Sequence, residues 1–148
     1  MRVLVIGAGA LGGYYGARMV RAGGDVTFLV REKRAEQLQK NGLQVVSPHG
    51  DFAVQPKIIQ AGDLKEPFDV VLVGVKAYSL DDAMSQFAPA VGPGTMILPI
   101  LNGLKHVDAL IARFGAARVL GGLANVSAGL DADAVSYTHL TLPTILRV

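Results

Sequence analysis

The sequence predicts an α/β fold with a doubly wound, mostly parallel sheet, and three observations support this prediction. Segments of strand character alternate with segments of helix character along most of the chain. The strand segments are unbroken apolar runs, as at 70–73 and 96–98, which is typical of strands covered on both faces. The chain also opens with an apolar strand, a glycine-rich turn and a helix-like stretch.

The first strand is predicted at 2–6 and the first helix at 10–22. The turn between them has the G-x-G-x-x-G spacing, in the run Gly7-Ala8-Gly9-Ala10-Leu11-Gly12. Gly7 permits a tight turn, Gly9 lets a pyrophosphate approach the backbone, and Gly12 lets the helix pack closely on the strand. The amides of the first helical turn can then bind phosphate. We therefore predict a Rossmann-type dinucleotide site, with a purely structural glycine turn as the alternative.

The second strand is predicted at 25–30 and is followed by Arg31, 24 residues after Gly7. In NAD-binding domains an acidic residue at this place accepts hydrogen bonds from the ribose hydroxyls, whereas a guanidinium can bind the 2′-phosphate of NADP. Arg31 therefore predicts NADP as the cofactor. Two alternatives stay open: a solvated basic start of the helix predicted at 33–41, and an inward rotation of Glu32 that would serve NAD.

The stretch from 43 to 60 departs from simple alternation. Strand-like runs at 43–46 and 52–54 flank a segment rich in turn residues, 47–51. This pattern predicts a β-hairpin inserted before the next parallel strand.

Two further strands, predicted at 69–75 and 95–99, lead to polar residues. Lys76 follows the first of them, and Asn102 comes shortly after the second. Ligands of open parallel sheets bind outside the carboxyl ends of the strands, so we expect both side chains near the nicotinamide and the substrate. Lys76 could hold a carboxylate or carbonyl oxygen, and the Asn102 amide offers a donor and an acceptor. The alternatives are a solvated lysine and an ordinary Asn-Gly turn or helix cap.

The remaining elements are helices at 79–88 and 104–113 and a strand at 118–124. Asp81 and Asp82 open the helix at 79–88. Acidic residues are favoured in the first turn of a helix by its dipole. We therefore interpret them as a helix start and not as a catalytic carboxylate pair.

Composition excludes several classes of function. The 148 residues carry a net charge of only +2, which does not indicate a nucleic-acid partner. No apolar run reaches the roughly 18 to 20 residues of a membrane span, so we expect a cytoplasmic protein without a membrane partner. Cysteine is absent, and the histidines, expected to be exposed, lie far apart at His49, His106 and His139. We therefore expect no metal site.

Residues 135–148 look foreign to the rest of the sequence. The run 135–144 can be back-translated into DNA that resembles a sequencing-library adapter. We therefore expect residues 1–134 to form the NADP-binding domain and 135–148 to be a non-native read-through tail. A genuine strand-like tail is the alternative.

Together these motifs resemble the 2-dehydropantoate 2-reductases, also called ketopantoate reductases. The resemblance covers nearly all of 1–130 and rests on the glycine turn and on the runs 16–18, 22–23, 25–31, 75–78, 102–104 and 118–122. Leu101 departs from the family, which usually has a polar residue there. The family reaction is hydride transfer from NADPH to the ketone of 2-dehydropantoate, which gives pantoate for coenzyme A synthesis.

The resemblance also implies roles for individual residues. The run from Gly7 to Gly12 would hold the NADP pyrophosphate, and Arg31 would bind the 2′-phosphate. Lys76 would lie beside cofactor and substrate, Asn102 would contact both, and the backbone near Ser127 would lie beside the cofactor.

The family's general-acid lysine and substrate-binding carboxylate lie in a helical C-terminal domain that these residues do not include. We therefore expect this chain to bind NADP and to turn over little or no 2-oxo acid by itself, because the developing alkoxide needs a proton donor. The family also makes a homodimer possible. Two other functions stay open: a related 2- or 3-hydroxyacid dehydrogenase, and a non-catalytic module that senses dinucleotides.

Overall fold

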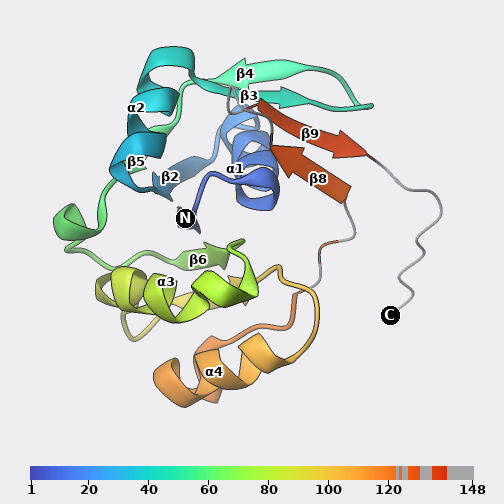
Figure 1. The fold of residues 1–148 in the computed structure, drawn as a ribbon. Helices are drawn as coiled ribbons and strands as arrows, with labels where there is room; N and C mark the ends of the chain where they lie inside the picture. Colours follow the sequence, from blue (N-terminus) through green and yellow to red (C-terminus); the bar gives the residue numbers. More distant parts are fainter. Residues whose placement is uncertain (123, 125–126, 131–134, 140–148) are drawn as a thin grey trace.

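A five-stranded parallel sheet in the order β5-β2-β1-β6-β7 forms the centre of the protein (Figure 1). The computed structural model describes residues 1–122, 124, 127–130 and 135–139. The strands of this sheet are β1 (Arg2–Ile6), β2 (Asp25–Leu29), β5 (Lys57–Ile59), β6 (Val70–Val73) and β7 (Met96–Pro99). The helices are α1 (Ala10–Arg21), α2 (Glu32–Asn41), α3 (Leu80–Phe87) and α4 (Lys105–Phe114). The predicted α/β fold with a doubly wound sheet is confirmed.

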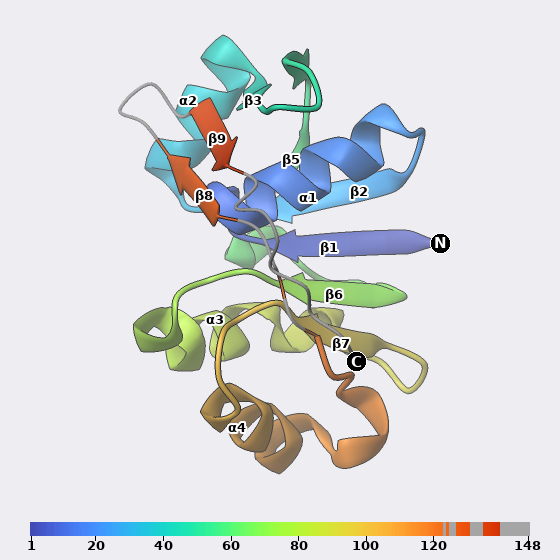
Figure 2. The same ribbon diagram turned by 90° about the vertical axis from the view of Figure 1, so that its right-hand side faces the viewer.

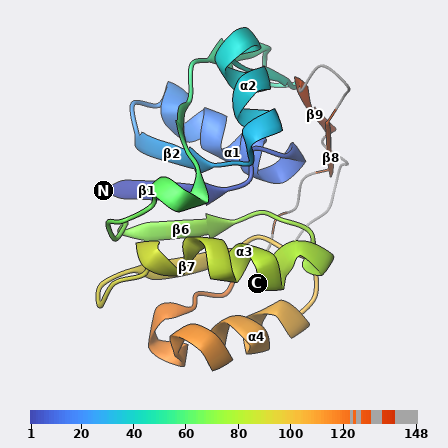
Figure 3. The same ribbon diagram turned by 60° about the vertical axis from the view of Figure 1, so that its left-hand side comes forward.

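Both faces of the sheet are covered, as the apolar strands predicted. Along β1, Leu4 and Ile6 belong to a core cluster that includes residues of α3 and α4. Their neighbours Val3 and Val5 belong to a second cluster that includes residues of α1 and α2. Successive side chains of a strand point to opposite faces, so the two helix pairs lie on opposite sides of the sheet. Figure 2 shows α1 against β1 and β2, and Figure 3 shows α3 against β6.

The predicted hairpin is present and belongs to a second sheet, in the order β4-β3-β9-β8. Strands β3 (Leu43–Val46) and β4 (Phe52–Val54) pair in antiparallel register. Strand β9 (Val135–His139) pairs parallel to β3 and antiparallel to β8 (Ser127–Leu130). The last strand of the 43–60 stretch, β5, leaves this group and pairs with β2 at the edge of the main sheet. That the residues from 135 onward are non-native stays a prediction, and 140–148 lie outside the described residues.

The prediction of a strand at 118–124 is wrong for the described residues of that segment, which form no strand. Within the described part of that segment, Val119 forms a single isolated bridge to Ile97. Arg118 ends a short 3₁₀ turn and donates to the carbonyl oxygens of Gly92 and Phe114, both at 3.1 Å. The glycines that follow, 121–122, have no side chains to pack on a sheet, so the apolar residues around them do not extend the strand.

His106 also differs from the prediction of an exposed histidine. It lies on α4 with only 5% of its surface exposed, and its Nε2 has no hydrogen-bond partner among the described residues. Burial lowers the pKa of His106, because an apolar environment disfavours the charged imidazolium. A lone histidine in an amphipathic helix carries no sequence signal that separates a buried site from an exposed one.

We expect this histidine to make the protein less stable in weak acid. The unfolded chain protonates His106 near the ordinary pKa of about 6.5, whereas the folded chain resists protonation to lower pH. Its contribution to stability is therefore complete above that pKa and is lost as the pH falls toward the lowered folded value. Urea unfolding between pH 7 and pH 5 should show a smaller decline in His106→Leu than in the wild type. Substitution of the exposed His49 by Asn is the matched control.

Candidate functional site

The strand order reverses between β1 and β6, and this point lies beside the glycine-rich turn. From β1 the chain builds outward through β2 and β5 on one side, and from β6 it builds through β7 on the other. In open parallel sheets, ligands bind outside the carboxyl ends of the strands at such a reversal. Gly74, just after β6, lies close to the first turn of α1. A Cβ added to Gly74 would be 3.1 Å from the amide nitrogen of Gly12.

The glycines of the turn differ in the atoms that surround them. Gly7 has a φ of +81° and donates its N–H to the carbonyl oxygen of Leu29 at 2.9 Å. A Cβ on Gly12 would collide with the carbonyl oxygen of Gly7. A Cβ on Gly9, by contrast, would have no atom of the described residues within 4 Å, apart from its two chain neighbours. Gly12 is therefore required by packing inside the protein, whereas the space in front of Gly9 is open to a ligand.

The hydrogen-bond ladder of α1 begins with the N–H of Gly13, which donates to the carbonyl oxygen of Gly9 at 2.8 Å. The amides of Leu11 and Gly12 precede this bond, and helix geometry directs such amides beyond the N-terminal end. The helix dipole adds about half a positive charge at the same end. The turn therefore has the donors and the open space that a diphosphate needs.

A cavity of about 290 Å³ lies at these strand ends, between α2 and α3. Its polar side chains come from both helices and from the end of β2. The lining residues are Ile6, Gly7, Ala8, Gly9, Leu29, Val30, Arg31, Arg34, Val75, Ser79, Asp82, Ala83 and Gln86. Since two arginines and one aspartate are its charged members, the cavity is suited to an anionic ligand.

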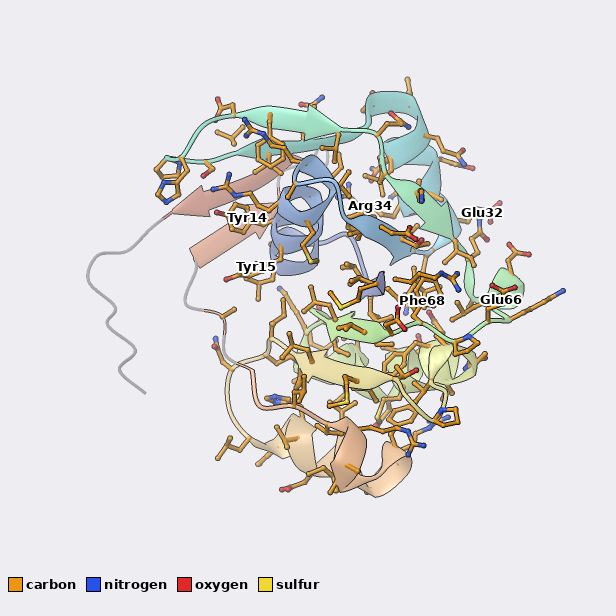
Figure 4. The ribbon with its side chains drawn as sticks, turned by 180° about the vertical axis from the view of Figure 1, so that it is seen from behind. Tyr14, Tyr15, Glu32, Arg34, Glu66 and Phe68 are labelled. Atoms are coloured by element: carbon orange, nitrogen blue, oxygen red, sulfur yellow. The ribbon has the colours of Figure 1, made fainter. Side chains whose placement is uncertain are left out.

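Arg34 is a charged residue of this cavity to which the sequence analysis assigned no role. It lies on α2 (Figure 4), and its guanidinium donates through Nε at 3.0 Å and through Nη2 to the carbonyl oxygen of Ala8. Its Nη1 is buried without a partner among the described residues, and burial lowers the pKa of Arg34. Arg34 therefore fastens the glycine turn to α2. Its place three residues after Arg31, on one face of a helix start, was the available signal.

Arg31 lies at the mouth of the same cavity and contacts α3. Its Nη2 is 2.7 Å from Oδ2 of Asp82, and the same oxygen accepts from Nε2 of Gln86 at 2.9 Å. Asp82 does stand in the acidic first turn of α3, as predicted, but the ion pair across the cavity was missed. Glu32, the alternative acidic residue, is exposed and is not among the residues that line the cavity.

Lys76 and Asn102 lie beyond the carboxyl ends of two neighbouring strands, β6 and β7. Val73 pairs with Pro99, and each polar residue comes three positions after its member of that pair. Both side chains are exposed, and neither lines the cavity that holds Arg31. Asn102 does not cap α4, whose N-cap is Leu104, so the helix-cap alternative is wrong. Ser127 begins β8 in the second sheet, and its side chain lies outside the described part of the chain.

Among the described residues the structure indicates neither a metal site nor a membrane-spanning helix. No three of their His, Cys, Asp and Glu side chains gather as metal ligands would. None of the helices among them is long and apolar enough to cross a bilayer.

Comparison with known proteins places the chain among reductases. Residues 3–145 match the family described as Ketopantoate reductase PanE/ApbA. The chain is 47% identical over 131 residues to the uncharacterized oxidoreductase YkpB of Bacillus subtilis, covering 88% of this chain and 43% of that protein. It is 35% identical over 121 residues to a 2-dehydropantoate 2-reductase of Nostoc, covering 80% and 37%. The chain thus spans less than half the length of these curated relatives.

Solved structures give the same result for the fold. A 2-dehydropantoate 2-reductase from Geobacter metallireducens superposes with a TM-score of 0.85 at 36% identity, over 98% of this chain and 51% of that one. A D-mandelate dehydrogenase solved with NADH and anilino(oxo)acetate superposes with a TM-score of 0.84 at 22% identity, over 94% and 46%. At that identity the second likeness concerns the fold alone.

Proposed function

The chain belongs to the ketopantoate reductase PanE/ApbA family, and from this premise we propose that it is the NADPH-binding portion of an enzyme that reduces a 2-oxo acid. The proposed substrate is 2-dehydropantoate and the product pantoate. The observation that carries the proposal is the open space where a Cβ of residue 9 would lie. This space is at the N-terminal end of α1, beside a cavity lined by two arginines. Phosphates would bind the amides of the turn, and Arg31 would bind the 2′-phosphate.

The polar residues at the next strand ends fit the substrate side of this reaction. A bound NADPH supplies the hydride. Lys76 brings a positive charge that stabilises the oxygen of a ketone as it gains negative charge, or the substrate carboxylate. The Asn102 amide can accept from the nicotinamide carboxamide and donate to the substrate. We assign the proton donor for the ketone oxygen to the portion of the relatives that this chain does not cover.

The arginine assignment predicts a difference between the two reduced nucleotides. Arg31→Ala should weaken NADPH binding about tenfold, because a hydrogen bond between charged groups contributes about 1.5–3 kcal/mol and part of this replaces the pair with Asp82. Binding of NADH, which has no 2′-phosphate, should change by less than about twofold. Nucleotide fluorescence during titration of the chain measures both affinities.

Lys33→Ala is the matched control, since Lys33 is an exposed cation two residues away that does not line the cavity. A wild-type preference for NADH would contradict the NADPH assignment. An equal loss for both nucleotides in Arg31→Ala would contradict the role of Arg31. Binding of neither nucleotide by the wild type would contradict the proposed function itself.

A further inference from the structure

The pair between Arg31 and Asp82 joins the two halves of the sheet across the mouth of the cavity. Arg31 follows β2, whereas Asp82 lies in the first turn of α3, after β6. Their side chains meet at 2.7 Å although the residues are 51 positions apart. Both residues line the cavity, so a nucleotide that binds there would contact the pair.

The helix start alone does not explain the position of Asp82. Asp81 and Asp82 both stand in the first turn of α3, where the dipole favours either of them. Asp82 alone of the two lines the cavity, and Gln86, one helical turn later, donates to the carboxylate oxygen that contacts Arg31. The carboxylate is thus held toward the arginine by a second side chain.

We propose that Asp82 reduces the preference for NADPH over NADH by competing with the 2′-phosphate for Arg31. This inference rests on the proposed function. A phosphate bound to Arg31 would bring its negative charge close to the carboxylate, so NADPH has to break the pair or accept the repulsion. The neutral ribose hydroxyls of NADH meet no such repulsion and can donate to the carboxylate. Asp82 therefore weakens the binding of NADPH relative to that of NADH. The preference for NADPH that Arg31 gives becomes smaller.

The size of this effect follows from the exposure of the pair. The two side chains keep 75% and 59% of their surface accessible, so water and salt screen the interaction. Exposed ion pairs of this kind change equilibria by about two- to fivefold. Asp82 is therefore expected to adjust the preference and not to reverse it.

The test is Asp82→Asn, which keeps the shape of the side chain and removes its charge. The dissociation constant for NADPH should fall about two- to fivefold, while NADH binds equally well or more weakly. Asp81→Asn removes one negative charge from the neighbouring residue and should give less than half of that gain in NADPH affinity. Arg31→Ala combined with Asp82→Asn should bind NADPH no better than Arg31→Ala alone, because the competition needs the arginine. Asp82→Ser, which also suits a helix start, should repeat the gain if the asparagine variant folds poorly.

The binding measurements separate a failure of this inference from a failure of the proposed function. Unchanged or weaker NADPH binding in both Asp82 variants would overturn the inference while leaving the proposed function intact. An equal gain in Asp81→Asn would overturn it too, because the effect would then be general electrostatics. If the wild type binds no nucleotide at all, the proposed function fails and the inference falls with it.

Discussion

Gly9→Ala is expected to abolish measurable nucleotide binding while leaving the protein folded. Apart from its chain neighbours, no atom in the described part of the chain would lie within 4 Å of a Cβ at this position, and the backbone φ of −81° suits alanine. Folding stability should therefore fall by no more than about 1 kcal/mol, the cost of a weaker helix N-cap. The new methyl group would occupy the space where the diphosphate meets the amides. Loss of two charged hydrogen bonds of about 1.5–3 kcal/mol each corresponds to a loss of affinity of at least a hundredfold.

Fluorescence titration with NADPH and with NADH measures this loss, and urea unfolding measures the stability. Gly94→Ala is the matched control, because its added Cβ also meets open space but lies at the opposite end of the sheet, before β7. It should change neither quantity by a measurable amount. Retention of wild-type affinity in Gly9→Ala would mean that the diphosphate does not bind at this turn.

The sequence predicted those features that local patterns encode. The order of strands and helices follows from apolar runs separated by turn residues, and four of the five strands expected in the main sheet are present. The spacing from Gly7 to Gly12 predicted a strand, a tight turn and a helix start, and the structure has them in that order. In each case the information lies within a few residues of the feature.

The contacts that complete the site join distant parts of the chain. Arg34 binds the carbonyl of Ala8 from 26 positions away, and Arg31 meets Asp82 from 51 positions away. The local pattern around Asp82 indicates only an acidic helix start, because its partner is set by how α3 packs beside the end of β2. The same limit applies to β5, whose three residues carry no signal of pairing with β2 rather than with the hairpin.

Gly12→Ala should destabilise the fold, in contrast to Gly9→Ala. The added Cβ would collide with the carbonyl oxygen of Gly7 and lie 3.2 Å from Cγ1 of Val5. Gly7 cannot easily move aside, because its N–H is bonded to Leu29 and its φ of +81° defines the turn. Overpacking costs about 1–3 kcal/mol or more, and here the obstacle is backbone, so we expect a net loss of about 2 kcal/mol in the free energy of unfolding. Better helix propensity offsets only about 1 kcal/mol of the gross cost.

The neighbouring Gly13→Ala separates this collision from any general effect of alanine in α1. Its Cβ would make ordinary contacts at 3.5 Å with Ala8 and 3.6 Å with Leu43, so the gain in helix propensity should leave stability unchanged or higher. Urea unfolding of the two variants side by side measures the difference. If Gly12→Ala were as stable as Gly13→Ala, the helix would not be held against the turn by this glycine. The close packing that directs the first-turn amides at a ligand would then need another cause.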